Sequence, residues 1–172
     1  MVAVVTDAAG VLGDNAEDLL RYFRRRVPTQ DAADLLAETL MTAWRRNRLL
    51  PSNTDQARAW LFGIAHHVLL NHRRGERRRH ALADRLRLSL PEQAGAGADE
   101  GLEVRDAIER LEPRLAEIVR LVHWEGFTLA QVAVVVELPA STVRNHYQLA
   151  KAELRSMLLE PARTSSVGPL TG

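Results

Sequence analysis

Residues 128–155 read TLAQVAVVVELPASTVRNHYQLAKAELR, and this stretch decides the fold of the C-terminal half of the chain. Its apolar residues recur at helical spacing on both sides of Pro139. Proline ends one helix and suits the first turn of the next, so the break between the two helices is local. The pattern predicts a helix-turn-helix. Glu137 stands where such turns usually carry glycine, which costs strain if this residue is left-handed.

The second helix of this pair is expected to turn Val143, Ala150 and Leu154 inward. Its other face carries short hydrogen-bonding side chains and cations, which read base edges and hold phosphates when a helix enters a major groove. An ordinary amphipathic hairpin has the same apolar spacing, so the motif alone leaves both interpretations open. The residues predicted to be exposed are Ser141, Thr142, Arg144, Asn145, Gln148 and Lys151.

Composition narrows the classes of function. The chain of 172 residues is long enough for one medium domain or two small ones. Because it has no cysteine, disulfides and zinc sites built on thiolates are excluded. No apolar run has the length of a membrane span, so we expect a cytoplasmic protein without membrane insertion. No catalytic signature is present, and we expect no enzyme activity, no small-molecule substrate and no cofactor.

Two helices are predicted in the first third of the chain. Residues 1–13 look unstructured, and Asp14 or Asn15 could cap a helix that runs to about residue 27. The second helix, residues 31–46, has an apolar stripe of Leu35, Leu36, Leu40, Met41 and Trp44. Its other face carries the carboxylates Asp31, Asp34 and Glu38, which could be a solvated face or a docking surface for a basic partner. Local spacing alone favours the solvated face.

The third predicted helix, residues 56–74, combines aromatic side chains with a strongly basic end. Trp60 and Phe62 lie in its apolar band, and residues 66–87 hold seven arginines against Glu76 and Asp84. Aromatic rings beside a basic strip suit a groove for single-stranded nucleic acid, because rings stack on bases while arginines follow phosphates. Trp and Phe at helical spacing are more often core residues, so both interpretations stay open.

Four histidines on this helix raise the question of a metal site. His66, His67, His72 and His80 have spacings at which pairs can chelate, but few acidic ligands lie among them. We therefore expect no metal site, and a histidine-metal enzyme is the weakest hypothesis for this chain.

The resulting fold class is all-α, with two small helical domains joined by a flexible linker. The glycine- and alanine-rich residues 88–101 separate a domain at 14–87 from one at 102–160, and a disordered tail is expected at 161–172. Helices are predicted at 102–111 and 113–123, with Pro113 at a helix start.

Three motifs in this order resemble bacterial sigma factors. DAADLLAETLMTAW at 31–44 resembles their polymerase-binding helix, and ARAWLFGIAHHVLLNHRR at 57–74 resembles their promoter-melting segment. Residues 111–155 resemble their promoter-reading C-terminal domain. The order and the short linker match the extracytoplasmic-function class, which keeps only these two domains. His67 and His146 stand where this class usually carries asparagine and arginine.

The resemblance implies binding to the largest catalytic subunits of core RNA polymerase and to promoter DNA. An anti-sigma factor is a further partner that the class often uses. The residues that it assigns to polymerase binding are Asp31, Asp34, Leu35, Glu38 and Thr39.

The resemblance also divides the promoter contacts between the two domains. Capture of the unpaired minus-ten strand is assigned to Asn53, Thr54, Trp60, Phe62, His66, His67, Asn71, Arg73, Arg74, Arg77 and Arg78. Reading of the minus-thirty-five element is assigned to Ser141, Thr142, Arg144, Asn145, His146, Gln148 and Lys151. The alternative is a free-standing helix-turn-helix regulator that binds duplex DNA without polymerase.

Overall fold

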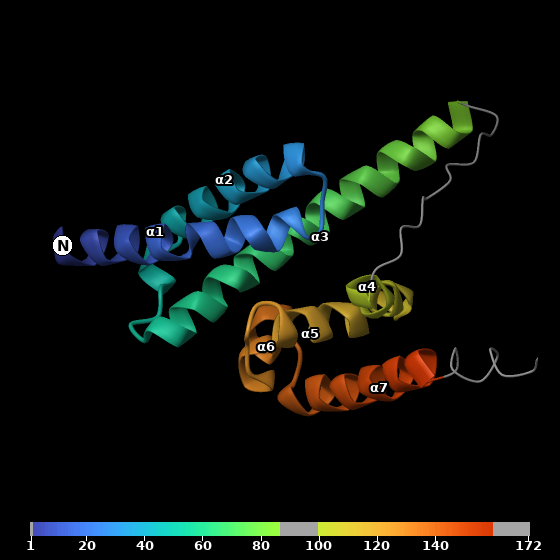
Figure 1. Ribbon diagram of the computed structural model, residues 1–172. Coiled ribbons are helices and arrows are strands. Elements are labelled where there is room, and N and C mark those ends of the chain that lie inside the picture. The colour runs from blue at the N-terminus through green and yellow to red at the C-terminus, as the bar shows by residue number, and fades with distance from the viewer. Residues whose placement is uncertain (1, 87–99, 160–172) are drawn as a thin grey trace, which may run out of the picture. The chain divides into compact units, whose positions relative to one another are not determined.

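The computed structural model describes residues 2–86 and 100–159, and the regular elements in these ranges are all helices. The predicted all-α class is confirmed. No helix in the described ranges is long and apolar enough to cross a membrane. Most of the predicted linker and all of the predicted tail lie outside the described residues. The elements are α1 (Val2–Arg24), α2 (Thr29–Arg45), the 3-10 helix η1 (Asn47–Leu49), α3 (Thr54–Leu86), α4 (Glu100–Arg110), α5 (Pro113–His123), α6 (Leu129–Val136) and α7 (Ala140–Leu159), as Figure 1 shows.

The described helices form two compact units. The first contains α1, α2, η1 and α3 together with Ala130–Glu137, and the second contains α4, α5 and α7. The domain boundaries expected from the sequence stay predictions.

The core of the first unit is built on aromatic rings from α1 and α3. Tyr22 meets Phe23 at 5.3 Å between ring centroids, and it meets Phe62 at 5.4 Å, both edge to face. All three side chains are fully buried, and Leu61 and Leu69 of α3 are buried with them. An edge-to-face pair contributes roughly 0.5–1.5 kcal/mol beyond the burial of its area. The contact of Tyr22 with Phe62 therefore helps to fix α1 against α3.

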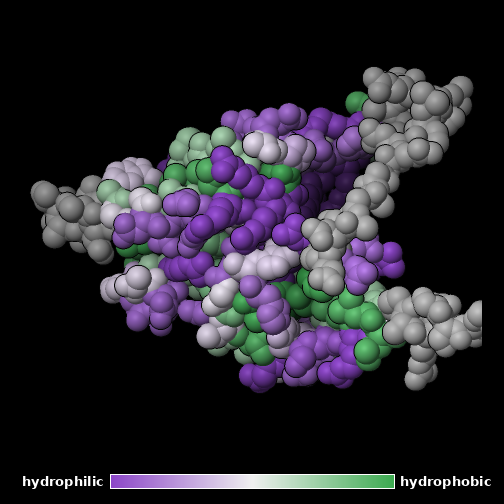
Figure 2. Space-filling view, in the orientation of Figure 1, coloured by the Kyte–Doolittle hydropathy of each residue, from purple (hydrophilic) through white to green (hydrophobic). Residues whose placement is uncertain are grey.

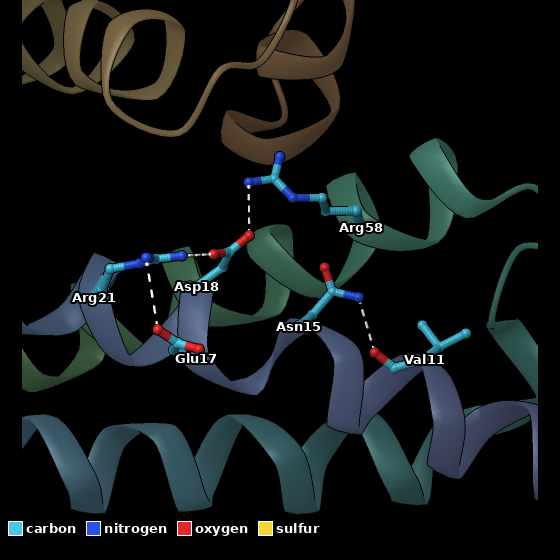
Figure 3. A network of polar contacts seen from close by, with 6 residues as sticks. All are labelled: Val11, Asn15, Glu17, Asp18, Arg21 and Arg58. Carbon is cyan, nitrogen blue, oxygen red and sulfur yellow. Dashed lines mark hydrogen bonds and ion pairs between the residues drawn. The ribbon is translucent and has the colours of Figure 1, made fainter.

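Helix α1 begins much earlier than the sequence predicts. It starts at Val2, so the expectation of an unstructured segment at 1–13 and a cap at Asp14 or Asn15 is wrong. Ala8 is buried, and Asn15 lies within the helix, where its side-chain amide donates to the Val11 carbonyl at 2.8 Å (Figure 3). Packing against α2 explains the difference, because most helical stability in proteins comes from tertiary contacts rather than from propensity.

Helix α3 is packed in its first half and exposed in its second. Asn53 precedes it, and the Asn53 side-chain oxygen accepts a hydrogen bond from the Gln56 backbone N–H at 3.0 Å, as a helix cap does. At 33 residues α3 is about 50 Å long. Leu69 is its last buried side chain among those described, and Figure 1 shows the C-terminal part extending past α1 and α2. This part therefore contributes little to the core.

The second unit has its own hydrophobic core. It contains Ile108 and Leu111 around α4, Leu115 and Val119 from α5, and Ala150 from α7. Trp124, Leu154 and Met157 pack against this cluster. The inward positions predicted for α7 are confirmed, because Val143 and Ala150 are fully buried.

The turn between α6 and α7 places Glu137 in the left-handed region. Its φ is 53°, the one positive φ among described residues other than glycine. Pro139 follows two residues later, and the Pro139 carbonyl accepts a hydrogen bond from the Val143 N–H at 3.1 Å, which opens α7. A residue with a side chain costs roughly 1–2 kcal/mol in this conformation.

An ion-pair network ties α1 to α3. Asp18 accepts hydrogen bonds from Arg21 of its own helix and from Arg58 Nη2 of α3, the latter at 3.4 Å (Figure 3). Partial burial alone would raise the pKa of Asp18, but hydrogen bonds and charges from both arginines outweigh it and lower the pKa. The ionised form is therefore the one that the folded state favours.

Asp18→Asn is expected to lower the free energy of unfolding by about 0.5–1 kcal/mol near neutral pH, the range of a partly exposed pair. Because the folded pKa lies below the unfolded value of about 3.9, the contribution is complete above that pH. It is lost as the pH falls through the folded pKa, so the two proteins converge in acid. Urea denaturation at several pH values measures this, with Asp14→Asn as a control at an exposed carboxylate of α1. Equal stabilities at pH 7 would contradict the assigned contribution.

The free energy of unfolding of Glu137→Gly is expected to be about 1 kcal/mol higher than that of Glu137→Gln, because glycine removes the cost of the left-handed conformation. Both variants lose the contact between Glu137 Oε1 and His67 Nε2 at 3.0 Å, so the comparison isolates the backbone. Chemical denaturation of the two variants measures the difference. A glutamine variant as stable as the glycine variant would show that the turn is unstrained.

Candidate nucleic-acid and partner-binding surfaces

Helix α2 carries an acidic surface. Asp34 and Glu38 are exposed, one turn apart on the same face. Asp31 is half-buried, and its Oδ2 lies 3.8 Å from His72 Nε2 of α3. Asp34 and Glu38 are therefore the carboxylates of this helix that are open to a basic partner.

Two residues predicted to bind polymerase are buried instead. Leu35 is 5% exposed and Thr39 is 0% exposed, so in this structure their side chains belong to the core of the unit and not to its surface. The Thr39 hydroxyl donates to the Leu35 carbonyl at 2.7 Å, which satisfies this polar group inside the core.

The apolar part of the α2 surface lies further along the helix. Met41 is 54% exposed and Trp44 is 44% exposed, although both belong to the apolar stripe predicted for this helix. Figure 2 shows hydrophobic residues gathered over α1 and α2. Met41 follows Asp34 by seven residues and Glu38 by three, so helical spacing could have placed it on their face. The groove beside them is lined by Ala9, Leu12, Gly13, Ala16, Leu40, Met41, Trp44 and Arg45.

Helix α3 exposes only part of the predicted minus-ten set. Phe62 is fully buried against Tyr22 of α1, so this ring is a core residue in the structure and is not exposed for DNA. Trp60 and His66 are half-buried, whereas His67 and Asn71 are exposed one turn apart. At the start of the helix Asn53 and Thr54 are exposed, but the Asn53 side-chain oxygen is engaged in the cap.

The basic end of α3 is open to solvent. Asn71, Arg74, Arg77 and Arg78 line one shallow hollow, and the three arginines are exposed. Arg73 is half-buried. The nearby acid Glu76 is engaged by Arg79 at 2.6 Å, so it does not neutralise the hollow. Arginines in such a hollow suit phosphate oxygens, which accept the two parallel N–H bonds of a guanidinium.

The four histidines of α3 do not gather into a metal site. His72 faces Asp31, and His80 Nε2 lies 3.9 Å from Glu76 Oε2. Across residues 2–86 and 100–159, no three His, Asp or Glu side chains are placed to hold a metal ion together.

Helix α7 exposes the surface that the sequence predicts for duplex DNA. Ser141, Arg144, Asn145, Gln148 and Lys151 are exposed, opposite the buried Val143 and Ala150. Thr142 and His146 are half-buried, and His146 Nδ1 is buried without a hydrogen-bond partner. The exposed set combines hydrogen-bonding groups with two cations, which suits base edges flanked by phosphates.

Two residues beside this surface did not stand out in the sequence. His123 ends α5, and its Nε2 lies 3.0 Å from the Tyr147 hydroxyl of α7. The pair joins positions 24 residues apart, so no local pattern could have found it. The available signal was that Tyr147 stands between Arg144 and Lys151 at spacings of three and four.

Comparison with protein families identifies both halves of the chain. The model of sigma-70 region 2 matches residues 12–79, and the model of sigma-70 region 4 matches residues 101–154. The extracytoplasmic-function RNA polymerase sigma factor SigL of Mycobacterium tuberculosis is 29% identical over 154 residues, which cover 86% of each chain.

Two solved structures share the fold. The sigma factor RpoE of Bartonella quintana, solved with the anti-sigma factor NepR, matches with a TM-score of 0.59 at 20% identity over 91% of this chain and 92% of that one. CnrH, solved with the cytosolic domain of CnrY, matches with a TM-score of 0.61 at 20% identity over 91% of this chain and 95% of that one. With both sigma regions present in order, the chain belongs to the extracytoplasmic-function class of RNA polymerase sigma factors.

Proposed function

We propose that this chain directs core RNA polymerase to a specific set of promoters and assists promoter melting, acting in the cytoplasm without chemistry of its own. The observation that carries the proposal is that one chain holds both sigma regions, and each region exposes charged or polar side chains that suit a binding surface. The first unit has an acidic and apolar surface on α2 and a basic one on α3, and α7 exposes a mixed surface.

Docking on polymerase is assigned to α2. Asp34 and Glu38 supply charge for a basic partner, and Met41 and Trp44 supply apolar area beside them. Interfaces favour this arrangement, because buried aromatic and Met side chains give most of the affinity while charges set orientation. The acidic docking surface, rather than the solvated face, is thus the interpretation that we adopt.

Melting of the minus-ten element is assigned to α3. His67 and Asn71 are exposed beside the half-buried Trp60, so an extruded base could be held there by hydrogen bonds and ring contact. His67 Nε2 lies 3.0 Å from Glu137 Oε1, so a base that bonds to this nitrogen would have to replace that contact. Arg74, Arg77 and Arg78 follow on the same helix and would hold the adjoining phosphates. A flipped base reaches these groups only after the duplex opens, so binding favours the melted state.

Regulation by an anti-sigma protein is proposed from the relatives. RpoE was solved with its anti-sigma factor NepR, and CnrH was solved with the cytosolic domain of CnrY. A protein of that kind that covers the α2 surface would keep this chain from polymerase.

Reconstitution tests the function directly. The purified chain added to core RNA polymerase is expected to form a stable complex that initiates at discrete promoters. Asp34→Arg should weaken complex formation at least about tenfold, because like charges across an interface cost several kcal/mol. Asp14→Arg is the matched control, since Asp14 is an exposed carboxylate of α1 outside this surface. No complex, with salt-sensitive duplex binding by the chain alone, would favour the free-standing regulator.

Arg144→Ala is expected to cost about 1–3 kcal/mol of promoter affinity in the holoenzyme, because one bidentate contact to guanine is worth that much. The loss should depend on the base at one position of the minus-thirty-five element. Competition binding with single-base promoter variants measures it. Arg155→Ala serves as the control, since Arg155 is exposed three turns further along α7. An equal loss on every sequence would reduce Arg144 to a phosphate contact.

A further inference from the structure

In the second unit, the side chains of His123 from α5 and Tyr147 from α7 are in contact. His123 Nε2 and the Tyr147 hydroxyl lie 3.0 Å apart, and the two rings stack at 6.0 Å between centroids with 27° between their planes. His123 is exposed and Tyr147 is half-buried. The hydroxyl is therefore held at the surface by a residue of a different helix.

Lys151 lies next to the pair of His123 and Tyr147. Its Nζ lies 5.6 Å from the centre of the Tyr147 ring, within the range of a cation–π contact. Arg144 stands one turn before Tyr147 and is also exposed. Cationic and phenolic groups thus follow one another along the edge of α7 that adjoins α5.

The hydrogen-bonding capacity of Tyr147 depends on His123. A phenol donates one hydrogen bond and can accept others. When His123 donates from Nε2 to the Tyr147 oxygen, the phenolic O–H stays available for a second acceptor. An anion near Lys151 favours this arrangement, because it accepts the O–H and gains the ammonium charge at the same point.

The position on α7 indicates which anion this is. A recognition helix turns the centre of its exposed face to base edges, while the phosphates lie along its two edges. Asn145 and Gln148 occupy the centre of the exposed face, and Tyr147 lies between that face and the buried Val143. Tyr147 is therefore placed for the DNA backbone and not for a base.

We propose that Tyr147 and Lys151 bind one phosphate of the minus-thirty-five duplex, with His123 as the residue that positions the Tyr147 hydroxyl. This inference rests on the proposed function. It adds a contact that strengthens promoter binding without selecting sequence, since a phosphate is common to every base pair.

The test measures promoter binding by the reconstituted holoenzyme. Tyr147→Phe keeps the ring under Lys151 and removes only the hydroxyl, and it should weaken binding about tenfold, at the lower end for a hydrogen bond to a charged group. The loss should be equal on matched and mismatched minus-thirty-five elements. Lys151→Gln should reduce the salt slope of binding by about 0.9, the value for one phosphate contact.

Three further variants separate positioning by His123 from a structural role. His123→Ala should weaken binding as Tyr147→Phe does, and His123→Gln should restore it, because the glutamine amide can still donate to the phenol. In the Tyr147→Phe background His123→Ala should have no further effect. An additive loss, or a failure of His123→Gln to restore binding, would overturn the positioning role.

Neutral phosphate replacements identify the partner atom. On promoters that each carry a single methylphosphonate, one position should weaken wild-type binding but leave Tyr147→Phe unaffected. Unchanged affinity of Tyr147→Phe in a holoenzyme that binds its promoter would overturn this inference alone. A chain that forms no holoenzyme would overturn the proposed function first, so the two failures are distinguishable.

Discussion

The edge-to-face contact of Tyr22 with Phe62 is the interaction on which the first unit depends. It fixes the rotation of α3 about its own axis, because the Phe62 ring can be buried in only one orientation of the helix. Once that rotation is set, His67 and Asn71 must lie on the opposite, exposed side. The core therefore aims the groups proposed to hold an extruded base. A change in the packing at Phe62 would rotate α3 and so move the proposed promoter-binding side chains, although Phe62 itself is not one of them.

In the second unit, the burial of smaller side chains fixes the rotation of α7 in the same way. Val143 and Ala150 of α7 are fully buried, and their spacing of seven residues sets which face remains for DNA. The start of this helix depends on a turn that keeps Glu137 at φ 53°. Strain at a functional turn persists only where the surroundings hold it in place. Here the buried α7 positions and Pro139 supply that constraint, so the local cost at Glu137 is tolerated.

Helical periodicity predicted the second unit better than the first. Pro113, Pro139 and the apolar spacing were sufficient for the bounds of α5 and for the exposed face of α7, since those signals are local. In α2 the same spacing predicts the apolar stripe but not how far α1 and α3 cover it, so it does not show that Met41 and Trp44 stay exposed. Thr39 was assigned to polymerase binding by the family resemblance alone. In the structure a hydrogen bond to the preceding turn allows its hydroxyl to be buried. The early start of α1 and the pairing of His123 with Tyr147 depend on tertiary contacts that no local pattern contains.

The chemistry of the two surfaces proposed for DNA implies a division between affinity and specificity. The exposed end of α3 offers arginines with little opposing charge, and such a surface binds any phosphate backbone with strong dependence on salt. Helix α7 offers Asn145 and Gln148, whose side chains both donate and accept and so can distinguish base edges. The proposed function thus assigns sequence choice at the minus-thirty-five element to the second unit and strand capture at the minus-ten element to the first. Because the arginines of α3 cannot discriminate among sequences, the proposed function leaves any selectivity at the minus-ten element to the exposed His67 and Asn71 of the same helix.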